Sequence, residues 1–287
     1  MTPGPDTDFA QLCAELCPGF RADGPTRRAR KSELLAGTLD GGAVIAKRLL
    51  RPTPVWEWYF AREVAIYREL QRHPPGVRMP RFVHADRGVL VIERLPGPPL
   101  ATRRRPHAQL DAATVANLVA MRTALAAWVG TLPALDPPAR VRSQLRDRLL
   151  EDPTDVDWIR DGILRSARRH VITGDQAASL TDALVAHAPV AFGHGDMLLR
   201  NCVGDGLVDW ECAGNYIHDW DLALVWTQLA PASRAPIDDA IGTGPRLDAF
   251  RALCAFALVR ELRFARAFSA RPDQIAQIRA ELDAVIC

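Results

Sequence analysis

The chain has 287 residues, of which 48% are hydrophobic and 24% are charged. This length is enough for one large domain or two lobes, and the composition is that of an ordinary globular protein. The formal net charge of +2 argues against nucleic acid as the main partner. Residues 1–100 contain 15 Lys and Arg against 11 Asp and Glu, whereas the remainder contains 21 against 23. The first part therefore suits a polyphosphate, and the second tolerates a neutral or cationic acceptor.

The six cysteines form no Cys-x-x-Cys pair, and no histidine cluster has zinc-site spacing, so we expect no zinc staple. The first 18 residues lack the basic start and apolar core of a signal peptide. No apolar run is long enough to span a bilayer. We therefore expect a cytoplasmic protein with reduced thiols and no membrane partner.

In chain order, residues 8–17 are predicted to form a short helix, and residues 20–50 are predicted to form strands. The strands turn at Asp40-Gly41-Gly42, a strong hairpin signal. A helix is expected at 55–71, because the Pro-Pro-Gly that follows it is a strong breaker. A second hairpin is expected over 81–93. The proline-rich segment 95–100 indicates a rigid connector.

The pattern after residue 100 is mostly helical, with helices predicted at 109–132, 140–151, 155–170, 175–187, 219–230, 245–269 and 272–286. A strand and a loop at 190–211 interrupt these helices. Strands first and helices after, with a β-ribbon set into the helical part, predict an α+β fold with two lobes.

The segment 190–211 contains the most informative motif of the chain. Residues 194–201 read His-Gly-Asp-Met-Leu-Leu-Arg-Asn, and residues 207–211 read Leu-Val-Asp-Trp-Glu beyond a tight turn. Asp196 can orient a hydroxyl as a general base, while Asn201 and Asp209 offer the oxygen ligands that Mg²⁺ prefers. Phosphoryl transfer from a magnesium nucleotide needs this layout, because its transition state is stabilised mainly by positioning and charge neutralisation.

This segment resembles the catalytic loop and metal-binding turn of the aminoglycoside phosphotransferase and choline kinase group, within the protein-kinase-like fold. The resemblance implies a β-rich nucleotide-binding lobe at 1–94, a hinge at 95–100, and a helical lobe at 101–287 with the catalytic loop and acceptor site. It also implies that His194 packs and hydrogen-bonds to hold the loop. Asp221 matches an aspartate that caps a helix and hydrogen-bonds to the catalytic loop, with Asp219 as the N-cap.

Lys47 ends the stretch Ala-Val-Ile-Ala-Lys, which is similar to the third strand of kinases. The resemblance implies that its ammonium meets the α- and β-phosphates. Glu63, inside the helix predicted at 55–71, is its expected ion-pair partner, with Glu57 and Glu69 as rivals.

The phosphate-covering loop departs from the kinase pattern, since no Gly-x-Gly-x-x-Gly is present. The equivalent hairpin falls in residues 20–35, where Ser32 is the candidate phosphate contact. The arginines just before Ser32 either add charge against the triphosphate or form a solvated turn. Glu93 and Leu95 match the hinge, whose backbone would meet the nucleotide base, with ATP or GTP as the cofactor beside Mg²⁺.

The sequence therefore predicts an ATP-dependent phosphotransferase that moves the γ-phosphate to a hydroxyl of an antibiotic-like or natural-product-like small molecule. The acceptor is expected against the helices after residue 109 and the last two helices. Two alternatives are a peptide Ser/Thr kinase and a non-catalytic nucleotide-binding regulator. The acceptor itself, a role in resistance or in biosynthesis, and the oligomeric state are left open. Candidate acceptor residues are Asp155, Asp157, Asp161, Glu261 and Glu211, the last of which is alternatively a further metal ligand.

Overall fold

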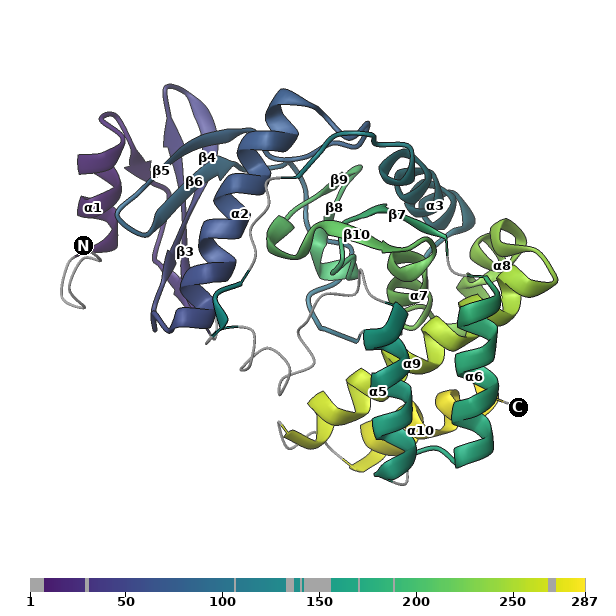
Figure 1. Ribbon diagram of the computed structural model, residues 1–287. Coiled ribbons are helices and arrows are strands. Elements are labelled where there is room, and N and C mark those ends of the chain that lie inside the picture. Colours follow the sequence, from purple (N-terminus) through teal and green to yellow (C-terminus); the bar gives the residue numbers. More distant parts are fainter. Residues whose placement is uncertain are drawn as a thin grey trace. The chain divides into compact units, whose positions relative to one another are not determined.

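The chain divides into two compact units, whose elements are labelled in Figure 1. The first unit comprises Met1–Leu100, Gly130–Asp147 and Asn201–Cys212, and the second comprises Ala101–Val129, Arg148–Arg200 and Ala213–Cys287. The structure is a computed structural model that describes residues 8–28, 31–105, 107–132, 137–139, 141, 156–169, 171–187, 189–267 and 272–286.

The described residues of the first unit contain an antiparallel six-stranded sheet. Its strand order is β1-β3-β4-β6-β5, and β2 also pairs with β3. The longest pairing joins β3 to β4 from Ser32↔Leu49 to Leu39↔Gly42. The strands are β1 (Arg21–Ala22), β2 (Arg27–Arg28), β3 (Ser32–Leu39), β4 (Gly42–Leu49), β5 (Phe82–Asp86) and β6 (Val89–Glu93).

Two tight turns set the register of this sheet. Asp40 and Gly41 have φ angles of 51° and 80°, and Arg87 and Gly88 have φ angles of 46° and 74°. Two successive left-handed residues match the right-handed twist of the flanking strands, which is why such turns favour short hairpins. The predicted hairpin at Asp40-Gly41-Gly42 is present, as is the one between residues 81 and 93.

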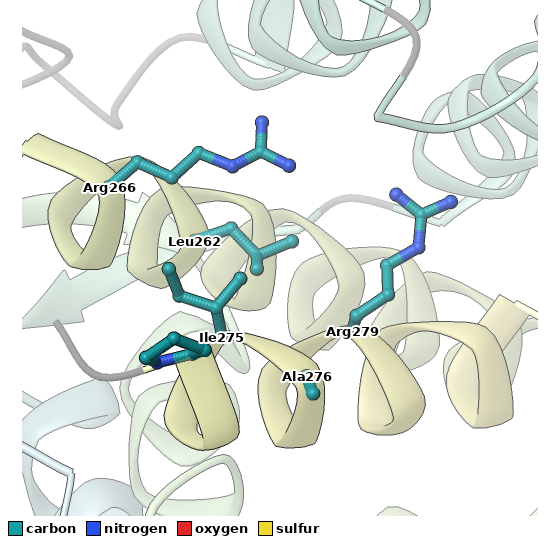
Figure 2. Close-up of a pocket in the computed structure, with 6 residues that line it drawn as sticks. Leu262, Arg266, Ile275, Ala276 and Arg279 are labelled. Atoms are coloured by element: carbon teal, nitrogen blue, oxygen red, sulfur yellow. The ribbon is translucent and has the colours of Figure 1, made fainter.

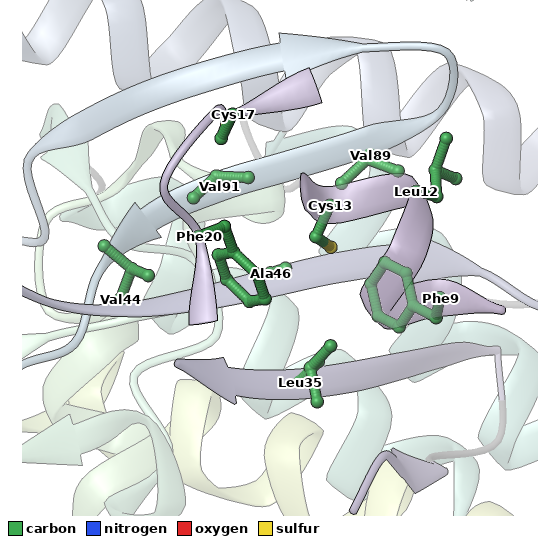
Figure 3. Packing of buried hydrophobic residues seen from close by; sticks show 10 residues of the cluster. All are labelled: Phe9, Leu12, Cys13, Cys17, Phe20, Leu35, Val44, Ala46, Val89 and Val91. Carbon is green, nitrogen blue, oxygen red and sulfur yellow. The ribbon is translucent and has the colours of Figure 1, made fainter. Parts of the chain in front are cut away.

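Helix α1 (Phe9–Leu16) covers one face of the sheet, and Figure 3 shows its side chains directed at the strands. Side chains alternate between the two faces of a strand, so Val44 and Ala46 of β4 join the α1 cluster while Lys47 points to the other face. The cluster consists of Phe9, Leu12, Cys13, Cys17, Phe20, Leu35, Val44, Ala46, Val89 and Val91.

Helix α2 (Pro54–Arg72) lies on the other side of the sheet from α1 (Figure 1). The helix starts where the Thr53 hydroxyl accepts a hydrogen bond from the Trp56 amide at 3.4 Å, with Pro54 at the first position. It ends at His73, just before Pro74-Pro75. Glu63 lies on its buried face, which brings a carboxylate to the side of the sheet that carries Lys47.

A small ribbon completes the first unit. Strands β8 (Cys202–Val203) and β9 (Gly206–Leu207) pair across a turn, and the 3₁₀ turn η2 (Trp210–Cys212) follows and packs against α2. The Leu207 amide donates to the Arg78 carbonyl, and the Leu100 amide donates to the Cys202 carbonyl, each at 2.9 Å. These bonds fasten the ribbon to the first unit.

The second unit is mainly helical around one strand pair. Strands β7 (Val190–Gly193) and β10 (Gly214–Ile217) are antiparallel, and the long α9 packs against α5, α6, α7 and α10. No helix of the described ranges combines the length and the apolar character that a membrane crossing requires. Its helical elements are α3 (Ala112–Ala126), α5 (Val156–Arg168), α6 (Gly174–Ala186), η1 (Leu199–Asn201, at the junction of the units), α7 (Trp220–Trp226), η3 (Pro231–Ser233), α8 (Ala235–Ile241), α9 (Pro245–Ala267) and α10 (Pro272–Ile286).

Some predicted boundaries in the second unit are wrong. α3 ends at Ala126, whereas residue 132 was predicted. α7 ends at Trp226, whereas residue 230, which directly precedes Pro231, was predicted. α8 and β10 were not predicted, because each is short and lacks a clear periodic pattern. The helix predicted at 140–151 lies almost entirely outside the described residues.

Candidate active site

The loop after β7 is held by a buried carboxylate of α7. The Asp221 side chain accepts hydrogen bonds from the backbone amides of His194 at 2.7 Å and Gly195 at 2.9 Å, and it is 1% exposed. The Trp220 indole donates to the Gly195 carbonyl at 3.1 Å. A Cβ atom at Gly193 would lie 2.7 Å from an Asp221 carboxylate oxygen, so this position requires glycine.

His194 is fully buried and contributes to the loop from within. Its Nδ1 atom accepts a hydrogen bond from the Asp196 amide at 3.4 Å. A buried ring with a bond to the loop backbone shapes the loop and does not reach solvent.

Asp196 carries its carboxylate at a partly exposed position in the same loop. The side chain is 18% exposed, and one oxygen lies 3.7 Å from the Arg200 guanidinium. The Leu199 amide donates to the Gln228 side chain at 3.0 Å, which anchors the loop to the end of α7. The Asp196 carboxylate is thus partly exposed on a loop that hydrogen bonds to Asp221 and Gln228 hold in place.

Lys47 forms the centre of a charged cluster within the first unit. Its ammonium donates to Glu63 and to Asp209, each at 2.7 Å, and lies 3.7 Å from Glu211. Lys47 is 7% exposed and Glu63 is 1% exposed. Burial alone would lower the pKa of Lys47, but Asp209, Glu63 and Glu211 outweigh it and hold that pKa well above its ordinary value.

Burial raises the pKa of Glu63, because a carboxylate loses its hydration there, and the nearby Asp209 and Glu211 charges act in the same direction. Lys47 opposes this shift. The two rival partners do not contact Lys47: Glu57 is exposed in the first turn of α2, and Glu69 contacts Arg72 and His73.

Asp209 has a left-handed backbone, with φ at 66°, although it is not a glycine. Such a conformation costs free energy and is often retained at functional sites. It turns the carboxylate toward Lys47 and α2. Asn201 lies in the same unit, is 4% exposed, and its carbonyl accepts from the Val208 amide at 2.9 Å.

Three carboxylates of the first unit could hold a metal ion. One oxygen each from Glu63, Asp209 and Glu211 lie within 4.8 Å of one another. All of these donors are oxygens, which fits a hard divalent cation such as Mg²⁺.

Glu211 lies in this cluster and not among the acceptor candidates of the second unit. One of its carboxylate oxygens is in contact with the ammonium of Lys31. The Lys31 ammonium also lies 4.9 Å from the Trp56 ring centroid and 5.9 Å from that of Tyr59. Burial lowers the pKa of Lys31, but Glu211 and Asp209 raise it overall. Lys31 is not recognisable as a site residue from the sequence, because a lysine at the end of a basic run carries no local signal of a distant partner.

The other residues predicted to contact the nucleotide, Ser32, Glu93 and Leu95, lie at strand ends or just beyond them. Ser32 is 4% exposed and begins β3 opposite Leu49. Glu93 ends β6, and its side chain accepts from the Arg81 amide at 3.2 Å. Leu95 is 6% exposed, so its side chain packs in the interior and its backbone is the part that could meet a base.

The acceptor candidates of the second unit do not form a cluster in the described residues. Asp155 lies outside the described residues, and the side chain of Asp157 is not described. Asp161 is exposed on α5. Glu261 is neutralised by Arg104, whose guanidinium donates to it at 2.8 and 3.0 Å.

A cavity of about 430 Å³ lies between α9 and α10 and is shown in Figure 2. Leu262 and Ile275 form apolar walls, and the guanidinium groups of Arg266 and Arg279 extend beside them. None of the predicted acceptor residues lines this cavity.

The arrangement can be compared with known proteins. Solved structures with the same fold include the macrolide 2'-phosphotransferase MphH from Brachybacterium faecium, with 16% identity, a TM-score of 0.60 and 96% coverage of both chains. A ternary complex of a thermostable mutant of aminoglycoside phosphotransferase APH(4)-Ia with AMP-PNP and hygromycin B matches with 14% identity, a TM-score of 0.63 and 98% coverage of both. An ethanolamine kinase from Plasmodium vivax matches with 10% identity, a TM-score of 0.52, and coverage of 93% of this chain and 82% of that chain.

The fold is therefore that of the protein-kinase-like phosphotransferases, with a β-rich first lobe and a mainly helical second lobe, as predicted. The profile of the phosphotransferase enzyme family matches residues 35–280. The chain belongs to this family of phosphotransferases, which confirms the resemblance seen in the catalytic-loop motif. A search of curated proteins found no match.

Proposed function

We propose that the protein transfers the γ-phosphate of ATP, bound as a magnesium nucleotide, to a hydroxyl of a small molecule. The contact of one buried ammonium, Lys47, with both Glu63 and Asp209 carries this proposal. A lysine held by a helix glutamate beside an oxygen-rich cation site suits the binding of a polyphosphate.

Each residue has a proposed role. Lys47 neutralises the phosphates, and Glu63 orients it. Asp209 and Asn201 hold Mg²⁺, with Glu211 as a further oxygen donor. The metal supplies charge neutralisation on the phosphate oxygens when it is bound. Ser32 contacts the phosphates from the start of β3.

The chemical step is an in-line displacement. The acceptor hydroxyl oxygen forms a bond to the γ-phosphorus, and the bond from that phosphorus to the β–γ bridging oxygen breaks. The hydroxyl proton passes to the Asp196 carboxylate, and ADP leaves. Asp221 and His194 keep the loop that carries Asp196 in shape through the hydrogen bonds described above. Positioned proton transfer contributes about 10²–10⁴-fold to the rate.

The hinge is proposed at 95–100, between lobes at 1–94 and 101–287, with the backbone near Glu93 and Leu95 against the base. The first segment of the first unit ends at Leu100. The acceptor is proposed to be an antibiotic-like or natural-product-like alcohol that meets the second lobe. This is drawn from the relatives, whose names state macrolide and aminoglycoside substrates.

The test is a turnover screen with ATP and GTP against aminoglycosides, macrolides, cyclic peptides, amino alcohols and sugars. With the acceptor found, Asp196→Ala should lower kcat by at least about 10²-fold and leave nucleotide affinity nearly intact. Asp209→Ala should weaken magnesium-nucleotide binding, and Lys47→Ala should impair both. Turnover by Asp196→Ala within a few-fold of wild type would remove the general base from the proposal, and a cyclic peptide as the best acceptor would favour a peptide kinase.

A further inference from the structure

Lys31 occupies an unusual position in the first unit. It lies 180 residues from Glu211 in sequence, yet its ammonium contacts one carboxylate oxygen of Glu211. The other oxygen of Glu211 lies 3.7 Å from the ammonium of Lys47. Both oxygens of this carboxylate therefore face a positive charge, and its side chain is only 13% exposed.

Within this cluster, carboxylates and ammonium groups lie in direct contact. Three carboxylates, from Glu63, Asp209 and Glu211, face two ammonium groups, from Lys47 and Lys31. An ammonium donates to the same carboxylate lone pairs that a divalent cation would use. A divalent cation held by these carboxylates would meet the positive charge of Lys31 at the same Glu211 carboxylate, so the two cations repel each other there.

We propose that Lys31 is a tethered counter-ion of the Glu211 carboxylate and competes with a divalent cation for it. A bound divalent cation would repel the Lys31 ammonium from Glu211. Lys31 lies directly before Ser32, so its charge would then meet the nucleotide phosphates from that segment. This inference rests on the proposed function for the place of the metal, and on the Lys31–Glu211 contact for the competitor.

The aromatic rings of Trp56 and Tyr59 allow the charge of Lys31 to be removed by mutation with little loss of its packing. They lie beside the Lys31 ammonium, so a substitution that keeps the side-chain length keeps most of the packing. Lys31→Met removes the charge and retains the stem. Arg27→Gln removes one positive charge from β2 of the same hairpin, where the side chain is exposed, and serves as the matched control.

The experiment measures the affinity of the protein for Mn²⁺ alone, without nucleotide, by titration calorimetry. Lys31→Met should bind Mn²⁺ about tenfold more tightly than wild type, since a contact charge in a half-buried site changes binding by that order. Arg27→Gln should change the affinity by less than about twofold. The double variant Lys31→Met with Glu211→Gln should lose the gain.

Unchanged or weaker Mn²⁺ binding by Lys31→Met would overturn the proposal, as would an equal gain in Arg27→Gln. If Lys31→Met does not fold, the wild-type protein provides a second measurement. Labelling of Lys31 by reductive methylation, read by mass spectrometry, should rise several-fold when Mg²⁺ is added. No rise would equally refute the competition.

The outcome is separable from that of the proposed function. The Mn²⁺ titration and the labelling use no nucleotide and no acceptor. A positive competition result together with no turnover in the acceptor screen would refute transfer to the proposed acceptor classes and leave the role of Lys31 standing. Turnover with an acceptor, but no competition between Lys31 and Mn²⁺, would support the proposed function and refute the role of Lys31.

Discussion

Replacement of Asp221 by Asn is the sharpest test of how the catalytic loop is held. The wild-type carboxylate accepts two backbone hydrogen bonds, at 2.7 and 2.9 Å, and is 1% exposed. An Asn side chain has only one acceptor oxygen and places an NH₂ group against the second backbone donor. One charged hydrogen bond is lost, and a buried amide is left without a partner.

The magnitude follows from these two losses. A hydrogen bond to a charged group contributes about 1.5–3 kcal/mol, and an unpaired buried donor costs about 1–3 kcal/mol. We expect Asp221→Asn to lower the free energy of unfolding by about 3 kcal/mol, which corresponds to a fall in Tm of roughly 5–10 °C for a chain of this size. The kcat should fall as well, because the amides of His194 and Gly195 directly precede Asp196.

The assay is urea unfolding followed by tryptophan fluorescence and circular dichroism, with kcat measured on the folded protein. Asp239→Asn is the matched control, since Asp239 is exposed on α8 and undergoes the same chemical change. A loss below about 0.5 kcal/mol in Asp221→Asn, or a loss equal to that of the control, would refute the reasoning.

Three further predictions follow from other contacts. Gly193→Ala places a methyl group against Asp221 and should lower both Tm and kcat, with near-normal values in both counting against the close approach. Arg246→Gln should cost about 1–2 kcal/mol of unfolding free energy at pH 7. Burial alone would raise the pKa of Asp219, but His218 and Arg246 together hold it far below its ordinary value. The difference in unfolding free energy between wild type and Arg246→Gln should therefore persist down to about pH 4 and shrink below it. Urea unfolding at several pH values would show this. Glu261→Gln should lower Tm and leave KM for the acceptor unchanged, because that carboxylate is already paired, and a raised KM would return it to the acceptor site.

The parts of the fold that were predictable are those with local signals. The Asp40-Gly41 turn demands left-handed backbone and sets the β3–β4 register, and α2 begins at a threonine cap followed by proline. His194, Asp196 and Asn201 stand within eight consecutive residues, so their spacing is visible in the sequence. Lys47 is recognisable because it directly follows the apolar run Ala43–Ala46 in β4.

The parts that were not predictable depend on contacts between distant residues. Lys31 and Glu211 are 180 positions apart, and Arg104 and Glu261 are 157 apart, so no periodicity signals either pair. β10 is too short to show an alternating pattern and is formed by its pairing with β7. Glu261 was a candidate acceptor residue because its partner, Arg104, lies far away in the sequence and gives no signal within α9.

The ribbon at Asn201–Cys212 belongs to the first unit, while the residues on both sides of it belong to the second. The chain therefore crosses from one unit to the other more than once, and the catalytic residues cannot be divided by a single cut. A fragment ending at residue 100 would contain Lys47 and Glu63 and lack Asp209 and Glu211, leaving a buried ammonium with two carboxylates fewer. A proteolytic cut between residues 101 and 200 would break the covalent link between the ribbon and the strands of the first unit. We therefore expect the two units to need expression and refolding as one chain. Two separate fragments should regain activity only if this ribbon pairs again with the first unit.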